Sequence, residues 1–281
     1  MKEFITPITD RKICDNKFLH IWNYAPKGRD LPHQGVEFID SITGESIKSY
    51  QVVAKPWTQN RMKSWATKEP WTVQWLRETL KPEHVFWDIG ACVGVYTIVA
   101  SNIIGCKKVF AFEPVPQNFC ELTNHISINE CENVEAYHVA ITDQVGYFDW
   151  TFSPEAGTGT SSIKRDGAVV AKHFCKIQNF TMDHLVFELG FEQPDIIKID
   201  TDGTESDIII NGGLKTLENV SSIMIEISGE PWERDFHKKL IDMGFELDME
   251  YYEGIRNARQ SRITPDMTAM RKKIVELMYN K

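Results

Sequence analysis

From residue 84 onward, short apolar segments alternate with segments whose apolar residues recur every three or four positions. The first pattern is typical of strands buried on both faces, and the second of helices that cover a sheet. The expected strands span residues 85–89, 108–112, 134–141, 195–199, 222–227 and 245–250. The expected helices span residues 93–104, 116–129, 204–217 and 232–243. Because strands that alternate with helices usually pair in parallel, we predict an open α/β sheet with helices on both faces.

The regions on either side of this alternation follow other patterns. The N-terminal part is interrupted by prolines until a helix bearing Trp71 and Trp75 begins at Pro70, since proline is tolerated in the first turn. After Pro265 the apolar spacing favours a helix. The expected divisions are an N-terminal cap on the acceptor side, the sheet domain and a C-terminal helical tail, at residues 1–81, 82–250 and 251–281.

Composition excludes several classes of protein. Hydrophobic residues make up 42% and charged residues 25% of the 281 positions, unlike disordered or collagen-like chains. The formal net charge of −9 disfavours a nucleic-acid partner. The six cysteines form no CxxC pair, and the N-terminus has no apolar signal region. The most apolar window, residues 85–105, carries Asp88 and three glycines, so we expect a cytoplasmic protein without a membrane span.

The segment DIGACVGVYT, residues 88–97, stands where the first expected strand gives way to a helix. Ligands of open α/β sheets bind at the carboxyl ends of strands, and glycines there allow close approach of the backbone. This pattern, DxGxxxG, differs from the GxGxxG of dinucleotide sites. The carboxylate of Asp88 would repel a pyrophosphate but suits an ammonium or a sulfonium group. Taken alone, the same pattern also fits a purely structural turn.

Two further acidic residues end neighbouring expected strands. Glu113 follows the second strand, where a carboxylate can accept hydrogen bonds from the vicinal hydroxyls of a ribose. Asp143 follows the third, where it could meet the amino group of an adenine. An ordinary surface carboxylate is the alternative at each position.

Together these residues resemble the FkbM-type family of S-adenosylmethionine-dependent methyltransferases. The resemblance is carried in order by DIGACVGVYT, AFEPVPQNFCELTNHISIN, VAITDQVGYF, TMDHL, PDIIKIDTDGTE and MIEIS. It implies a class I methyltransferase fold, Rossmann-like, with a seven-stranded sheet whose last strand is antiparallel. It also implies that residues 82–250 bind S-adenosyl-L-methionine through Asp88, Gly90, Ala91, Cys92, Gly94, Tyr96, Thr97, Glu113, Pro114, Thr142 and Asp143. The methionine part is expected near Gly90, the ribose at Glu113 and the adenine at Asp143. The usual asparagine after Gly-Ala is replaced by Cys92.

Carboxylates also gather after the later strands. These residues are Asp200, Asp202, Glu205 and Glu226. We expect Asp200, Asp202 and Glu226 to be catalytic, because methylating a hydroxyl requires a base or a Lewis acid. Asp200 and Glu226 could alternatively hold a divalent metal such as magnesium. Asp202 and Glu205 could instead cap the following helix.

The function expected from these observations is O-methylation of a hydroxyl on a sugar or another small metabolite. Lys55, Arg61 and Lys68 in the cap could meet an anionic acceptor or could lie on a solvated face. A non-catalytic module that binds the cofactor together with a glycan or a protein partner is one alternative. An NAD-dependent dehydrogenase is another, although the missing GxGxxG disfavours it. Neither the acceptor nor the oligomeric state can be read from the sequence.

Overall fold

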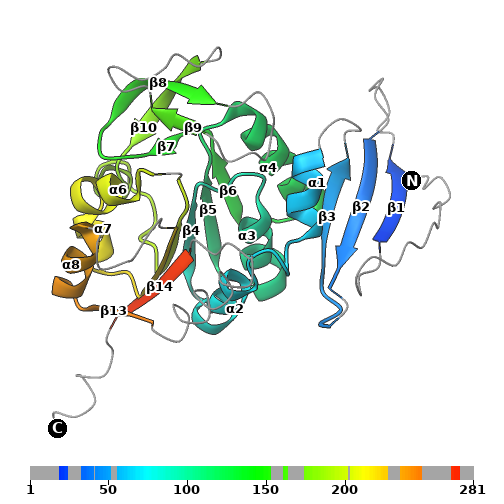
Figure 1. The fold of residues 1–281 in the computed structure, drawn as a ribbon, viewed down its shortest axis with the longest axis horizontal. Coiled ribbons are helices and arrows are strands. Elements are labelled where there is room, and N and C mark those ends of the chain that lie inside the picture. Colours follow the sequence, from blue (N-terminus) through cyan, green and yellow to red (C-terminus); the bar gives the residue numbers. More distant parts are fainter. Residues whose placement is uncertain are drawn as a thin grey trace, which may run out of the picture.

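A seven-stranded sheet forms the centre of the computed structural model (Figure 1). The structure describes residues 19–24, 33–40, 42–51, 56–152, 161–163, 174–201, 203–226, 235–248 and 267–272. Across the central sheet the strands are β13 (Phe245–Leu247), β14 (Met267–Lys272), β12 (Ser222–Glu226), β11 (Ile196–Ile199), β4 (Val85–Ile89), β5 (Lys108–Phe112) and β6 (Val134–Tyr137). β6, β5, β4, β11 and β12 pair in parallel, as the sequence predicts.

In β4, β11 and β12, neighbouring apolar residues belong to opposite hydrophobic clusters, as the pleat of a β-strand requires. Phe86 of β4 packs in one cluster with Trp75 and Leu76 of helix α2 (Pro70–Thr79). Trp87 packs in the other cluster. Helices α5 (Met182–Phe187), α6 (Glu205–Gly212) and α8 (Asp235–Asp242) cover that second face. The first expected helix is divided into α3 (Val95–Ile98) and a π-helical segment (Val99–Ile104).

The prediction of a helical tail is wrong for residues 267–272, which form strand β14. β14 lies antiparallel between β12 and β13, where its backbone hydrogen-bonds on both sides. Six residues are too few for apolar spacing to separate a strand from a helix, so long-range pairing decides. The seven strands with the last antiparallel, implied by the resemblance, are therefore present, but the last strand lies in the tail.

Two other expected elements are interrupted. The strand expected at 134–141 ends as β6 at Tyr137, and β7 (Ala140–Ile141) instead pairs with β10 (Phe174–Phe180). β10 continues to β8 (Gly146–Phe152) and β9 (Ser161–Ile163), giving a second sheet of four strands. The helix expected at 204–217 breaks at Gly213 into α6 and α7 (Leu214–Leu217). A Cβ on Gly213 would lie 1.9 Å from Cε of Met182, so glycine allows α5 to pack here.

The N-terminal region carries a third sheet, made of β1 (Leu19–Tyr24), β2 (His33–Ile39) and β3 (Ser46–Gln51). Helices α1 (Pro56–Lys63) and α4 (Pro116–Ile128) lie between this sheet and the central one (Figure 1). Beyond the end of α4, Asn129 pairs with the backbone of Lys48, accepting from its N–H and donating to its carbonyl, each at 2.7 Å. The ring of His125 joins Ser49 Oγ, at 3.0 Å from Nε2, to the carbonyl of Val93, at 2.7 Å from Nδ1. The N-terminal sheet is therefore fastened to the turn that follows β4.

Within the described ranges, no helix combines the length and the apolar character that crossing a membrane requires.

Candidate functional site

The chain leaves β4 toward β5 on one side of the sheet and returns later to β11 on the other. This reversal of strand order is where open α/β sheets bind ligands, beyond the carboxyl ends of the strands. A cavity that opens to solvent lies here, with about 700 Å³ of free space. The strand ends contribute Ile89, Gly90, Cys92, Phe112, Glu113, Pro114, Ala140, Ile141, Asp200, Thr201 and Glu226. Other elements contribute Arg61, Lys68, Glu69, Asn118 and Trp150. We call this the first cavity.

The glycines of the turn after β4 have separate packing roles. Gly90 has a φ of +78°, and a Cβ there would lie 1.8 Å from the carbonyl oxygen of Asp200. Gly90 therefore lets the turn lie against the end of β11. Gly94 has a φ of +90°, and its Cβ would lie 2.6 Å from Cδ1 of Leu122 on α4. Gly94 lets α4 approach the turn and lines neither this cavity nor the one described below.

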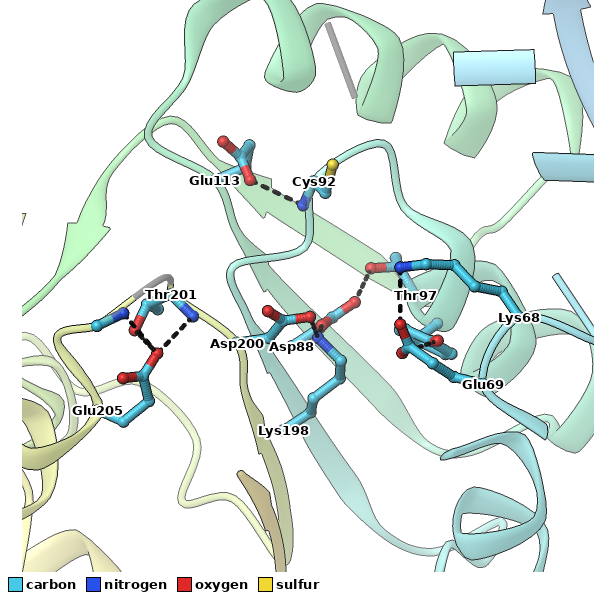
Figure 2. A network of polar contacts seen from close by, with 12 residues as sticks. Lys68, Glu69, Asp88, Cys92, Thr97, Glu113, Lys198, Asp200, Thr201 and Glu205 are labelled. Carbon is cyan, nitrogen blue, oxygen red and sulfur yellow. Dashed lines mark hydrogen bonds and ion pairs between the residues drawn. The ribbon is translucent and has the colours of Figure 1, made fainter. Parts of the chain in front are cut away.

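Cys92 also adopts a left-handed backbone, with a φ of +52°. Asparagine tolerates this conformation better than most residues, which gives a physical reason for the asparagine usual at this position. The backbone N–H of Cys92 donates to Oε2 of Glu113 at 2.7 Å (Figure 2). Burial raises the pKa of the Cys92 thiol to about 12, so it stays protonated at neutral pH and is a poor nucleophile.

Glu113 is held rigidly at the wall of the first cavity. Its Oε1 accepts from the backbone N–H of Val115 at 2.8 Å and, more weakly, from the amide of Asn118 at 3.4 Å. The side chain is 3% exposed. Burial raises its pKa to about 7, although these N–H groups and that of Cys92 lower it. The bond from Cys92 leaves a lone pair on Oε2, whereas the second lone pair of Oε1 meets the long contact from Asn118, which a hydroxyl of a vicinal diol would have to displace.

A buried ammonium lies between two carboxylates beside the turn (Figure 2). Nζ of Lys198 is 2.9 Å from Oδ2 of Asp200 and 3.8 Å from Oδ1 of Asp88. The Thr97 hydroxyl donates to Oδ2 of Asp88 at 2.7 Å, and the ring of Tyr96 lies 5.0 Å from Nζ. Asp88 is 0% exposed and Lys198 1% exposed. Asp88 and Thr97 therefore line neither cavity, and they position the groups that do.

The carboxylate of Asp200 is stabilised in its ionised form. Burial raises its pKa, but the Lys198 ammonium, a hydrogen bond from Glu226 and the nearby Arg61 lower it well below its usual range. The Glu226 side chain is thus a hydrogen-bond partner of Asp200. Both residues line the first cavity, as the catalytic prediction requires.

These side chains do not fit a divalent metal. Lys198 already neutralises Asp200, and Arg61 adds a second positive charge nearby. Over the ranges that the structure covers, no group of three or more His, Cys, Asp or Glu residues could hold a metal ion. Asp202 lies outside those ranges. Glu205, the first residue of α6, accepts from Thr201 N at 3.1 Å and from Gly203 N at 3.0 Å, both in the loop before the helix.

The other residues that the sequence predicts at the site differ in which cavity they line. Pro114 lines the first cavity, whereas Ala91 and Tyr96 line a second, adjoining one. Thr142 and Asp143 line neither. The Thr142 hydroxyl accepts from the amide of Asn179 at 3.2 Å, beside the second sheet.

Several lining residues were not predicted as site residues. Trp150 reaches the first cavity from β8, where its indole N–H donates to Oδ1 of Asn179 at 3.0 Å. Lys198 lies within the segment PDIIKIDTDGTE, but nothing local distinguishes it from a surface lysine. Arg61 and Lys68, for which a solvated face was equally open, line the first cavity, whereas Lys55 lies outside the described residues.

A sequence profile described as "Methyltransferase FkbM domain" matches residues 88–272. The chain belongs to the FkbM methyltransferase family. It is 26% identical over 168 residues to the hexuronic acid methyltransferase AglP of Haloferax volcanii, covering 60% of this chain and 66% of that protein. It is 26% identical over 164 residues to the 2-O-methyltransferase NoeI of Sinorhizobium fredii, covering 53% and 65%. The chain thus spans about two thirds of the length of these curated relatives.

Among solved structures, the chain is similar to M. jannaschii TYW2 in complex with AdoMet. The TM-score is 0.40 at 14% identity, covering 89% of this chain and 90% of that chain. The precorrin-6y C5,15-methyltransferase of Geobacter metallireducens gives a TM-score of 0.39 at 18% identity, covering 66% and 73%.

The FkbM profile begins at Asp88 and ends at the last residue of β14. It therefore covers every strand of the central sheet except the first three residues of β4. Arg61, Lys68 and Glu69 lie upstream of the match, yet they line the first cavity. In this member of the FkbM family, the N-terminal region contributes part of the site.

Proposed function

We propose that the protein transfers a methyl group from S-adenosylmethionine to a hydroxyl group of a sugar. Membership of the FkbM methyltransferase family supports the reaction. The names of the two relatives, a hexuronic acid methyltransferase and a 2-O-methyltransferase, support a sugar hydroxyl as acceptor. The observation that carries the proposal is the first cavity, where the buried Glu113 stands at one wall and the Asp200–Glu226 pair lines the same space.

The cavity fits the adenosine part of the cofactor. Glu113 would bind the ribose hydroxyls through a lone pair of Oε2 and through Oε1, where a hydroxyl would replace the long contact from Asn118. The aromatic rings of Phe112 and Trp150 and the side chain of Ile141 supply apolar walls for a purine ring. Asp143 does not line this space, so we assign the adenine to these apolar side chains instead.

The cofactor supplies an electrophilic methyl group that leaves its sulfonium by in-line displacement. Asp200 would accept a hydrogen bond from the acceptor hydroxyl and so align its oxygen for attack. The hydroxyl becomes strongly acidic as its oxygen bonds to carbon. A carboxylate of depressed pKa can therefore take the proton late in the step, provided that it is ionised. Lys198 keeps it so.

Cofactor affinity is expected to depend on pH through Glu113. The ribose hydroxyls donate to the ionised carboxylate, whereas protonation removes an acceptor. With a pKa of about 7 in the unliganded protein, the dissociation constant of S-adenosylhomocysteine should rise roughly tenfold between pH 8 and pH 6. The free energy of unfolding of the unliganded protein should change with pH in the opposite direction. Glu113 is buried and its pKa is raised, so its protonation stabilises the fold, and this contribution is lost as the pH rises through 7. Isothermal titration calorimetry across this range measures the affinity.

Glu113→Gln should bind S-adenosylhomocysteine more weakly and with a flat pH profile. Glu192→Gln, at an exposed position paired with Lys107, is the matched control and should keep the wild-type profile. A pH dependence that persists in Glu113→Gln would assign the titration to another group.

The reaction is tested with S-adenosylmethionine labelled in its methyl group and a panel of neutral and carboxylated glycosides. Mass spectrometry should find one labelled methyl group on a sugar, as an ether that resists mild alkali. Asp200→Asn should lower kcat about 100-fold, the low end for acid–base residues because its depressed pKa makes it a weak base. Binding of S-adenosylhomocysteine without any methylated product would favour the non-catalytic module, and full turnover of Asp200→Asn would refute the role of Asp200.

A further inference from the structure

A second cavity of about 380 Å³ adjoins the first. Arg61, Lys68, Gly90, Cys92 and Asp200 line both, so the two spaces meet at the glycine turn. Residues of the N-terminal region form one wall of the second cavity, and the turn after β4 forms the other.

The N-terminal wall of the second cavity is rich in hydrogen-bond donors. Trp65 lines this cavity and is 1% exposed. Its indole N–H has no hydrogen-bond partner among the residues that the structure describes. A buried donor without an acceptor is costly, so a ligand oxygen at this position would be stabilising. Arg61 on α1 adds a permanent positive charge, and the Lys68 ammonium lies at the same wall.

Acidic groups stand close to these donors. Asp200 lines the second cavity, and Glu69, which lines the first, pairs with Lys68 at 2.8 Å and accepts from the Tyr96 hydroxyl (Figure 2). The surroundings therefore offer donors for a carboxylate and acceptors for an ammonium within one small space. An α-amino acid carries both groups on a single carbon.

We propose that the second cavity binds the α-amino-acid end of the cofactor, with Arg61 and the indole N–H of Trp65 binding its carboxylate. This inference rests on the proposed function. Cys92 connects the two cavities. Its backbone N–H donates to Glu113 at the wall of the first cavity, and Cys92 also lines the second cavity. A molecule with its ribose at Glu113 would thus extend past Cys92 toward Arg61.

A carboxylate on the sugar acceptor is the other source of the same chemistry. The positions of the acidic residues favour the cofactor. Glu226, which we assign to the acceptor side with Asp200, lines the first cavity but not the second. The second cavity is instead bordered by residues 90–93 of the turn.

Calorimetry with two ligands tests the proposal. S-adenosylhomocysteine carries the amino-acid end, and 5′-methylthioadenosine lacks it. Arg61→Met should weaken binding of S-adenosylhomocysteine roughly 10- to 100-fold, as expected for losing hydrogen bonds to a charged group, and leave 5′-methylthioadenosine unchanged. Trp65→Phe, which keeps an aromatic ring but removes the N–H, should weaken only S-adenosylhomocysteine, by roughly fivefold. Lys63→Met, at an exposed position of α1 outside both cavities, is the matched control.

The outcomes separate the alternatives. Unchanged binding of S-adenosylhomocysteine, with a raised KM for carboxylated glycosides, would assign Arg61 to the acceptor and overturn the proposal. Equal losses for both ligands would mean that Arg61 shapes the whole site, which also overturns it. Wild-type protein that binds neither compound would refute the proposed function itself, whereas wild-type binding with no effect of either substitution would refute this inference alone.

Discussion

Replacing Lys198 by methionine should lower the free energy of unfolding by about 3–5 kcal/mol, the usual effect of removing one partner from a buried ion pair. Lys198 lies between Asp88 and Asp200 and is 1% exposed. Methionine fills a similar volume but leaves both carboxylates without their cation. Burial already raises the pKa of Asp88 although Lys198 lowers it, so without the ammonium this carboxyl would become neutral more readily. Chemical denaturation at pH 7 measures the effect.

Lys107→Met is the control for removing a lysine from an ion pair. Lys107 and Glu192 are 54% and 43% exposed, so this change should cost less than about 1 kcal/mol. The double variant Lys198→Met, Asp200→Asn should be less destabilised than the sum of the single changes, by about 1–3 kcal/mol, because one of the stranded charges is removed with its partner. A loss below about 1 kcal/mol for Lys198→Met would show that the ammonium is not needed to hold the carboxylates.

Lys198→Met should also alter the pH dependence of catalysis. Lys198 is the largest of the influences that lower the pKa of Asp200. Without it, Asp200 would be protonated at higher pH, and kcat at saturating cofactor should gain an acid limb that the wild-type protein lacks. Lys198 would then be a positioning residue, which keeps Asp200 ionised without touching the acceptor.

The fold was predictable where the signal is local. Strands β4, β5 and β11 are buried along nearly their whole length, so their apolar runs predict a sheet covered on both faces. β14 was mistaken for a helix because its position depends on pairing with β12 and β13, which no local pattern records. The break at Gly213 likewise depends on Met182, a residue distant in the sequence.

In the candidate site too, some residues have a local signal in the sequence and others depend on contacts between distant segments. Glu113 and the glycine turn follow strands directly, and the carboxyl ends of parallel strands meet at one edge of the sheet, so their neighbourhood follows from the fold class. Trp150 and Arg61 reach the cavity from the second sheet and from α1, which only the tertiary structure brings there. Asp143 also ends a segment at the expected place, but the chain has by then left the central sheet for β7.

Gly90→Ala should remove cofactor binding and lower the free energy of unfolding by about 3–5 kcal/mol. Left-handed backbone costs alanine about 1–2 kcal/mol relative to glycine, and overpacking adds up to about 3 kcal/mol. The new Cβ would lie 1.8 Å from the carbonyl oxygen and 2.8 Å from the carbonyl carbon of Asp200, both backbone atoms. No side chain can rotate away to relieve this contact, so the turn and the end of β11 must separate. That movement carries Asp200 away from Cys92 and opens the wall that both cavities share.

Gly190→Ala separates backbone strain from the clash. Gly190 has a φ of +73°, close to the +78° of Gly90, but a Cβ there meets nothing within 4 Å. It should therefore lose only about 1–2 kcal/mol and bind S-adenosylhomocysteine as the wild type does. Denaturation and calorimetry on both variants give the comparison. Equal losses of stability, with cofactor binding retained in Gly90→Ala, would mean that the end of β11 can yield to the turn, and that the close approach at Gly90 is not what joins the cofactor side of the site to Asp200.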